Sequence, residues 1–157
     1  MKPVIRMSAL MELPVKFIYT HDSFRVGEDG PTHEPIEQEA QIRLMEQVKN
    51  FSGKPSVLVI RPADSAETVE AYKMAMENKE TPTVLIFSRQ NLEDLPGENR
   101  REEAKKASKG GYVVMAAENP DVVLVANGSD VALLCHAAES LKAEGVNAQV
   151  VSVYMRK

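Results

Sequence analysis

Three short apolar runs, separated by segments with helical spacing, constrain the fold of this 157-residue chain more than any other feature. The runs occupy residues 15–19, 57–60 and 83–87 and consist mainly of Val, Ile, Leu and Phe. Strands that are apolar on both faces are typical of parallel sheets covered by helices on each side. The sequence therefore predicts an α/β fold with a parallel sheet flanked by helices.

The segments between these runs have the spacing of amphipathic helices. Residues 36–51 follow Pro35, which suits the first turn of a helix. The expected apolar face of this helix consists of Ala40, Leu44, Val48 and Phe51. A second helix is expected after Asp64, which has Glu67 three residues later in the pattern of a capping box. Its expected apolar face consists of Val69, Tyr72 and Met76.

A charged segment interrupts this alternation. Residues 90–110 contain two leucines and many charged side chains, so we interpret them as a linker with at most one short solvated helix at 100–108. The expected division is therefore a first unit at 1–89, the linker, and a second, small α/β unit at 111–157.

The second unit repeats the alternation on a smaller scale. Its expected strands are residues 112–115, 122–126 and 148–153. Ser129 is expected to cap a helix that Gly145 ends. The expected apolar face of this helix consists of Val131, Leu134, Ala138 and Leu141.

Composition excludes several classes of protein. The chain has 19 Lys and Arg against 23 Asp and Glu, whereas a nucleic-acid-binding surface needs a basic excess. No stretch reaches the roughly 18 consecutive apolar residues of a membrane span, and the interrupted N-terminus does not resemble a signal peptide. A single cysteine, Cys135, excludes an internal disulfide, and we expect a cytoplasmic protein.

Polar residues follow each strand of the first unit immediately. These residues lie at 20–23, 61–64 and 88–91. Because ligands of open parallel sheets bind beyond the carboxyl ends of the strands, this edge is the expected site.

Two histidines are the first candidates for chemistry at this edge. His21 and His33 flank a Gly-Glu-Asp-Gly-Pro turn in a strongly acidic stretch. An imidazole changes charge near neutral pH, so both are candidates for proton transfer, although two structural histidines would produce the same pattern. Within the turn, Asp29 is a candidate acceptor for a substrate hydroxyl.

Other polar residues have simpler interpretations. Arg89 follows a buried strand and suits a phosphate, although an ion pair with a neighbouring Glu fits equally well. We expect Arg61 to form a salt bridge, Asp64 to cap a helix, and Cys135 to lie in the core. We expect His136 on the surface or as a satisfied core residue, and the tyrosines and methionines in the core. Spacing in the histidine loop matches no zinc or EF-hand pattern, so no metal site is predicted.

Long segments of the chain, in order, resemble the transketolase family. The loop reads THDSFRVGEDGPTHEPIEQ at 20–38, and LVIRPADSAET follows at 58–68. The resemblance continues with TPTVLIFSRQNL at 81–92, KGGYVV at 109–114 and the run at 121–153. It implies a truncated thiamine-diphosphate-binding fold, made of the later part of a pyrimidine-binding domain and the start of a C-terminal domain.

The resemblance also implies an activity and residue roles. Transketolases of the pentose phosphate pathway transfer a two-carbon ketol unit between sugar phosphates, using thiamine diphosphate and Mg²⁺, and they are homodimers. By residue match, His21 would contact the substrate phosphate or hydroxyls and Arg89 would clamp the phosphate. Asp29 would accept a substrate hydroxyl, and His33 would assist proton movement near the reacting carbons.

Several family features have no counterpart in the chain. The diphosphate-binding domain with its metal ligands and the catalytic glutamate are missing, and Arg25 replaces a residue that is usually small or apolar. We therefore expect the isolated chain to bind neither cofactor tightly and to be inactive. The alternatives are a non-catalytic assembly module that pairs with a separate diphosphate-binding chain, and a relative of deoxyxylulose-phosphate synthase.

Overall fold

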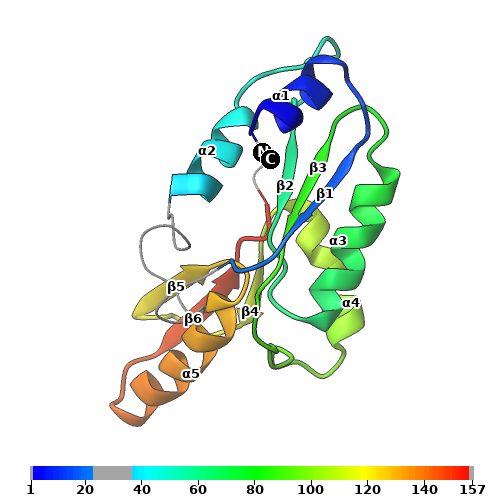
Figure 1. Ribbon diagram of the computed structural model, residues 1–157. Coiled ribbons are helices and arrows are strands. Elements are labelled where there is room, and N and C mark those ends of the chain that lie inside the picture. The colour runs from blue at the N-terminus through cyan, green and yellow to red at the C-terminus, as the bar shows by residue number, and fades with distance from the viewer. Residues whose placement is uncertain (1, 23–36, 156–157) are drawn as a thin grey trace.

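A three-stranded parallel sheet organises the first half of the chain in the computed structural model, which describes residues 2–22 and 37–155. The central strand β3 (Thr83–Ile86) pairs in parallel with β1 (Lys16–Tyr19) on one side and β2 (Leu58–Ile60) on the other (Figure 1). The predicted parallel sheet is confirmed, and each strand is one residue shorter than predicted.

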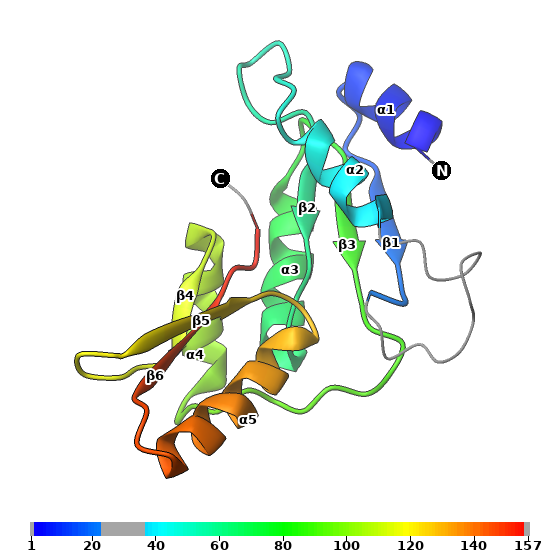
Figure 2. The ribbon, with the colours of Figure 1, turned by 90° about the vertical axis from the view of Figure 1, so that its left-hand side faces the viewer.

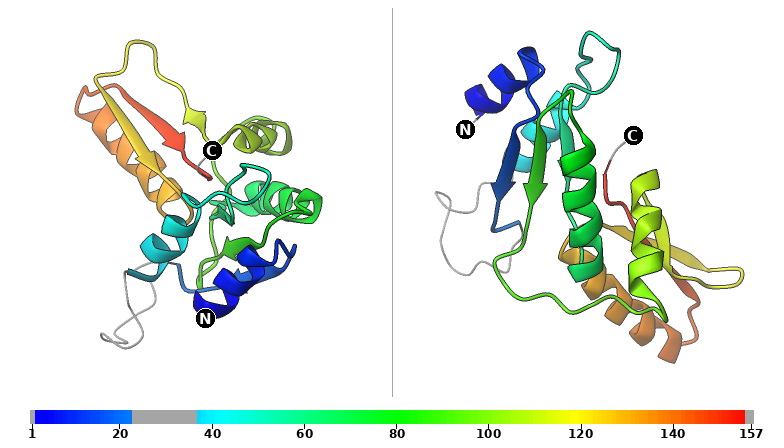
Figure 3. Two further views of the ribbon diagram at one scale, coloured as in Figure 1. Left: turned by 90° about the horizontal axis from the view of Figure 1, so that it is seen from above. Right: turned by 90° about the vertical axis from the view of Figure 1, so that its right-hand side faces the viewer.

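Helices cover both faces of this sheet (Figure 3). Side chains along a strand alternate between its faces, so Val84 and Leu85, both fully buried, enter different cores. Val84 packs in a cluster with residues of α1 (Lys2–Leu10) and α2 (Glu37–Met45). Leu85 packs in a cluster with residues of α3 (Ser65–Glu77). The predicted covering of the sheet on both sides is confirmed.

The apolar face predicted for α3 is wrong. Val69, Tyr72 and Met76 are 66, 43 and 58% exposed, whereas Ala71 and Ala75 pack against the sheet. Small alanines allow close packing of helix and sheet, and helical spacing alone did not distinguish this face from the larger apolar one. Large apolar side chains are therefore left uncovered on α3.

The first predicted helix is shorter than its pattern suggested. α2 ends at Met45 instead of residue 51, and residues 46–48 continue as turns with hydrogen bonds to the carbonyl three residues earlier. Ser56 donates its hydroxyl to the Met45 carbonyl and its amide to the Val48 carbonyl. Three of the four residues of its predicted face are strongly exposed: Leu44, Val48 and Phe51. Helix α1 was not predicted at all, although proline is tolerated early in a helix, as Pro3 is here.

The expected linker is a packed connection instead of a solvated one. α4 (Arg100–Ala104) and the 3₁₀ helix η2 (Lys105–Lys109) follow each other without a break. Ala104 and Ala107 are fully buried, and Ala107 belongs to the same core as α3. The expected helix is therefore solvated on one side and packed through its alanines on the other, and the domain boundaries stay a prediction.

A smaller mixed sheet forms the second unit (Figure 2). β6 (Ala148–Ser152) lies between β4 (Tyr112–Met115), which is antiparallel to it, and β5 (Val122–Ala126), which is parallel. α5 (Asp130–Ala143) begins after Ser129, as predicted, and buries one face. The buried residues of that face are Val131, Cys135 and Ala138. The Ser129 side chain makes no capping hydrogen bond, so the predicted cap is wrong. Within residues 2–22 and 37–155, no helix has the length and apolar character needed to cross a bilayer.

Candidate functional site

The carboxyl ends of β1 and β3 meet at one edge of the parallel sheet (Figure 2). Tyr19 pairs with Ile86 in the last register position of the two strands. His21 and Arg89 follow two and three residues later, and both are exposed. The structure therefore brings these two predicted site residues to the same edge. The other two, Asp29 and His33, lie outside the described residues, and so does Arg25.

His21 has an unusual backbone conformation. Its φ angle is 71°, in the left-handed region, which costs a residue with a Cβ roughly 1–2 kcal/mol. The His21 Nδ1 lies 2.9 Å from the hydroxyl oxygen of Thr20. Such strain persists where surrounding contacts impose it, and it is found most often at functional sites.

A buried ion pair fixes the residue that follows His21. The side chain of Asp22 is 1% exposed, and its Oδ2 accepts a hydrogen bond from Arg61 Nε at 2.9 Å. The backbone amide of Ser129 donates to the same oxygen at 3.4 Å. The predicted salt bridge of Arg61 is confirmed, and the end of β1 is anchored directly behind His21.

Further partners surround the Arg61 guanidinium. Nη2 lies 3.2 Å from Asp130 Oδ2, and Nη1 lies 3.9 Å from Glu39 Oε2. Burial would lower the pKa of Arg61, but the carboxylates of Asp22, Glu39 and Asp130 raise it overall. The arginine therefore stays charged in a site that is closed to solvent.

A second buried polar cluster lies at the start of α3. Glu67 is completely buried, and Tyr112 donates its hydroxyl to Glu67 Oε1 at 2.7 Å. Arg100 donates to that same hydroxyl at 2.8 Å and pairs with Asp64 at 2.8 Å. Burial raises the pKa of the Glu67 carboxyl and of the Tyr112 hydroxyl.

Sequence reasoning found only the local part of this cluster. Asp64 caps α3 as predicted, with its Oδ1 accepting from the Glu67 amide at 2.8 Å. Glu67 reaches back as expected, but its Oε2 accepts from the amide of Ala63 at 2.8 Å. The Tyr154 hydroxyl donates to the Glu67 carbonyl. Neither this long-range bond nor that of Tyr112 had a signal in the sequence.

The expectation that the tyrosines lie in the core holds for Tyr112 and Tyr154 but is wrong for Tyr72, which is 43% exposed. The same expectation for the methionines is wrong for Met7, Met11 and Met76, which are all more than half exposed.

The predictions for Cys135 and His136 on α5 agree with the structure. Cys135 is buried in the core of the second unit, and burial raises the pKa of its thiol to about 11. His136 is exposed, with its Nε2 3.3 Å from a Glu93 carboxylate oxygen. Among the described side chains, no group of three or more His, Cys, Asp or Glu is arranged to hold a metal ion.

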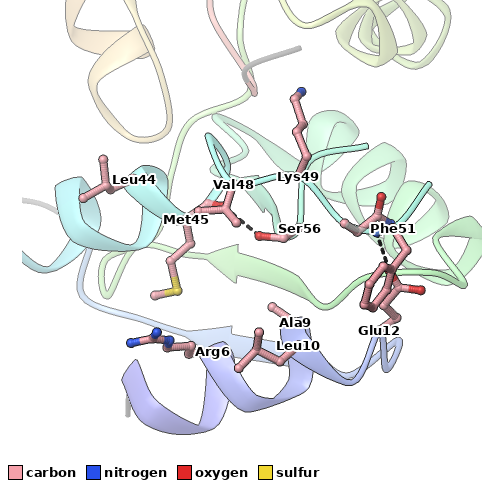
Figure 4. Close-up of a pocket in the computed structure, with 11 residues that line it drawn as sticks. Arg6, Ala9, Leu10, Glu12, Leu44, Met45, Val48, Lys49, Phe51 and Ser56 are labelled. Atoms are coloured by element: carbon pink, nitrogen blue, oxygen red, sulfur yellow. Dashed lines mark hydrogen bonds between the residues drawn. The ribbon is translucent and has the colours of Figure 1, made fainter. Parts of the chain in front are cut away.

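A mostly apolar groove of about 450 Å³ lies between α1 and the end of α2 (Figure 4). The residues that line it include Ala9, Leu10, Leu44, Met45, Val48 and Phe51. These residues precede β1 and β2 in the chain, so the groove lies toward the amino ends of the strands. It is therefore separate from the edge that carries His21 and Arg89.

Comparison with known proteins gives one consistent family. The chain matches the transketolase pyrimidine-binding domain over residues 1–94 and the transketolase-like C-terminal domain over residues 110–157. It is 49% identical to a transketolase of Halalkalibacterium halodurans over 154 residues, which cover 98% of this chain and 22% of the relative. The chain thus spans about a fifth of the length of the curated relatives it matches.

Solved structures lead to the same family. A Pichia stipitis transketolase in complex with sedoheptulose-7-phosphate is 42% identical, with a TM-score of 0.81 over 99% of this chain and 21% of that one. A split-gene transketolase, described as an inactive β4 tetramer, is 28% identical, with a TM-score of 0.68. This second match covers 96% of the chain and 43% of its relative.

Proposed function

The chain belongs to the transketolase family, and we propose that it supplies the sugar-phosphate-facing edge of a site that transfers a two-carbon ketol unit between sugar phosphates. The observation that carries this proposal is the shared edge of β1 and β3, just beyond which His21 and Arg89 both follow in the chain and are exposed. A related transketolase has been solved with sedoheptulose-7-phosphate, which supports a phosphorylated sugar as the substrate.

The two described residues have complementary roles in this proposal. Arg89 binds the phosphate, because its planar guanidinium can donate two parallel hydrogen bonds to phosphate oxygens. His21 donates a hydrogen bond to the phosphate or to a sugar hydroxyl. Asp29 would accept a hydroxyl of the substrate, and His33 would move a proton near the reacting carbons. These last two roles rest on the residue match with the family.

The diphosphate end of the cofactor belongs to another part of the site, since this chain matches the family's pyrimidine-binding domain over residues 1–94. Thiamine diphosphate, when bound with Mg²⁺, supplies the electron sink for cleavage of the carbon–carbon bond. The portion of the chain seen here has no cluster of metal-ligating side chains, so it does not fit the diphosphate and its ion. The described residues are therefore not expected to hold the diphosphate, and we expect the isolated chain to be inactive.

A segment exchange tests the proposed activity. This chain would replace the matching 154-residue segment of the H. halodurans transketolase, with which it shares 49% identity. We expect the hybrid to transfer a ketol unit between sugar phosphates, and the isolated chain with thiamine diphosphate and Mg²⁺ to show no turnover. A folded hybrid without activity, beside an active parent enzyme, would contradict the proposal.

An assembly role is the second candidate. The split-gene transketolase matches 96% of this chain, and apolar side chains on α1, α2 and α3 are exposed. A separate diphosphate-binding chain could cover such surfaces. Mixing this chain with the diphosphate-binding part of the H. halodurans enzyme, followed by size-exclusion chromatography, separates the two candidates. Co-elution without activity favours assembly alone, and co-elution with activity favours catalysis. The match to transketolases favours both over the deoxyxylulose-phosphate synthase alternative.

A further inference from the structure

Arg61 is a buried cation that joins three separate parts of the chain. Its residue is 6% exposed, and it directly follows β2. Its hydrogen-bonding partners are Asp22 after β1, and Asn127, Ser129 and Asp130 at the turn between β5 and α5. That turn lies beside the end of β1 in two perpendicular views (Figures 1 and 2). A single guanidinium therefore links the two sheets next to the candidate edge.

On the side of the first sheet, Arg61 contacts Asp22, the residue that follows His21 in the chain. Arg61 Nε and the Ser129 amide converge on Asp22 Oδ2, at 2.9 and 3.4 Å. The other carboxylate oxygen of Asp22 is buried and has no partner among the described atoms. Because a buried carboxylate without a cation is costly, Asp22 has a strong preference for the place beside Arg61.

The contact with the second unit involves the backbone as well. The Gly128 amide donates to the Arg61 carbonyl at 3.2 Å, and the Arg61 amide donates to the Tyr154 carbonyl at 3.3 Å. A Cβ on Gly128 would lie 2.4 Å from Arg61 Nε, so the turn approaches the side chain closely. The second unit therefore holds Arg61 through main-chain and side-chain contacts together.

We infer that Arg61 is a positioning residue, through which the second unit fixes the backbone at His21 for sugar-phosphate binding. The part of this inference that concerns sugar-phosphate binding rests on the proposed function. The link that Arg61 makes between the second unit and Asp22 does not depend on it. Arg61 does not touch the substrate, since its guanidinium is already shared among the groups named above. The second unit thus has a role in the site through Asp22, to which the Ser129 amide donates directly.

Arg100 provides a matched comparison within the same chain. It is also a largely buried arginine, it pairs with Asp64 of the first unit, and it bonds to Tyr112 of the second. None of its described bonds reaches Asp22 or His21. An effect that comes only from weakening the junction between the units would therefore appear equally in variants of Arg100 and Arg61.

The test uses the ring signals of the three histidines in proton NMR spectra of the 157-residue chain. We expect Arg61→Gln to shift or broaden the His21 signal beyond its linewidth and to leave the His136 signal unchanged. Asp130→Asn, which alters only the second-unit side, should move the His21 signal in the same direction by a smaller amount. Arg100→Gln should leave it in place.

Two results would overturn the inference. One is an unchanged His21 signal in a folded Arg61→Gln variant, and the other is an equal change in Arg100→Gln. If Arg61→Gln does not fold, Arg61→Lys and Asp130→Asn decide the question in its place, because each leaves part of the cluster intact. An unmoved His21 signal in both folded variants would then overturn it.

A second readout links the positioning role to catalysis. In the hybrid enzyme, Arg61→Lys should lower kcat/KM for a sugar phosphate by about tenfold or more, because a small displacement of His21 weakens its contact with the substrate. Arg100→Lys should change it much less, and equal losses in the two variants would contradict the role. An inactive hybrid would count against the proposed function only, because the NMR comparison does not depend on turnover.

Discussion

Glu67 illustrates how burial sets the chemistry of a single residue. Its carboxylate accepts from the Tyr112 hydroxyl and the Ala63 amide, but the nearby cation, Arg100, pairs with Asp64 instead. Hydrogen bonds therefore compensate only part of the loss of hydration, and the pKa of Glu67 is raised. The charged form of this residue opposes folding.

The stability of the chain should therefore depend on the protonation of Glu67. A folded-state pKa above the unfolded value of 4.5 means that the stabilising contribution is complete below pH 4.5 and is lost as pH rises through the folded pKa. Urea unfolding of the wild-type chain and of Glu67→Gln, at a series of pH values, measures this. The free energy of unfolding of the wild type, minus that of the variant, should fall as pH rises. A constant or rising difference would disagree with the assignment.

The Tyr112 hydroxyl should have a measurable effect on stability. Tyr112→Phe removes the donor to buried Glu67 and the acceptor of Arg100, so we expect a loss of about 2 kcal/mol in the free energy of unfolding. Tyr72→Phe is the control, since Tyr72 is 43% exposed and should change stability by less than about 0.5 kcal/mol. Equal losses in the free energy of unfolding of the two variants would show that the buried Tyr112 hydroxyl stabilises the fold no more than an exposed one.

Residues whose partners are local could be predicted from the sequence, and the others could not. Asp64 was identified as a cap because its acceptor position depends on residues one turn away. Tyr112 and Glu67 are 45 residues apart, and their bond depends on how the two units pack. The placement of His21 and Arg89 at one edge lies between these cases, since it needed only the parallel direction of two strands.

At the scale of elements, strands were easier to predict than helix faces. A short apolar run between polar segments predicts a strand, and β1, β2 and β3 all appeared where expected. α3 carries both alanines and large apolar residues, so either face could have packed on the sheet. The sheet selected the alanines, because close packing needs small side chains. Spacing therefore predicted the helix but not its orientation.

The turn between β5 and α5 should tolerate no side chain at Gly128. Gly128→Ala forces an alanine into the left-handed region of φ, which destabilises the fold by about 1 kcal/mol. It also places a Cβ 2.4 Å from Arg61 Nε. Gly145→Ala is the matched control, because its φ is also positive and no atom lies within 4 Å of its Cβ position. In urea unfolding we expect Gly128→Ala to be less stable than Gly145→Ala by a further 1–3 kcal/mol, roughly the cost of overpacking. Similar losses would mean that the close approach carries no strain.

At the scale of the whole molecule, uncovered apolar surface is the main feature. Large side chains on α1, α2 and α3 are exposed, and β1 is an edge strand of its sheet. Monomeric proteins rarely leave such surface open, and unpaired strand edges promote association. The homodimer implied by the family resemblance stays a prediction. The exposed apolar surface itself favours association with another protein chain or a second copy of this one.

The isolated chain should therefore self-associate. We expect its sedimentation coefficient to rise with concentration, and the double variant Val69→Ser/Met76→Ser to weaken this dependence, since it makes the exposed stripe of α3 polar. Glu77→Gln on the same helix serves as the control and should behave like the wild type. A monomer at every concentration tested would contradict the expectation.

The central claim is that the shared edge of β1 and β3 binds the phosphate of a sugar, and Arg89 tests it most directly. In the hybrid enzyme, Arg89→Gln should raise KM for a phosphorylated ketose by roughly 10- to 100-fold, the loss of a charge-assisted hydrogen bond. It should leave kcat/KM for the unphosphorylated ketose nearly unchanged, and Arg101→Gln, on the exposed side of α4, should leave both values unchanged. We expect this selective loss, whereas an unaltered KM for the phosphorylated substrate in Arg89→Gln would show that the edge does not bind the phosphate.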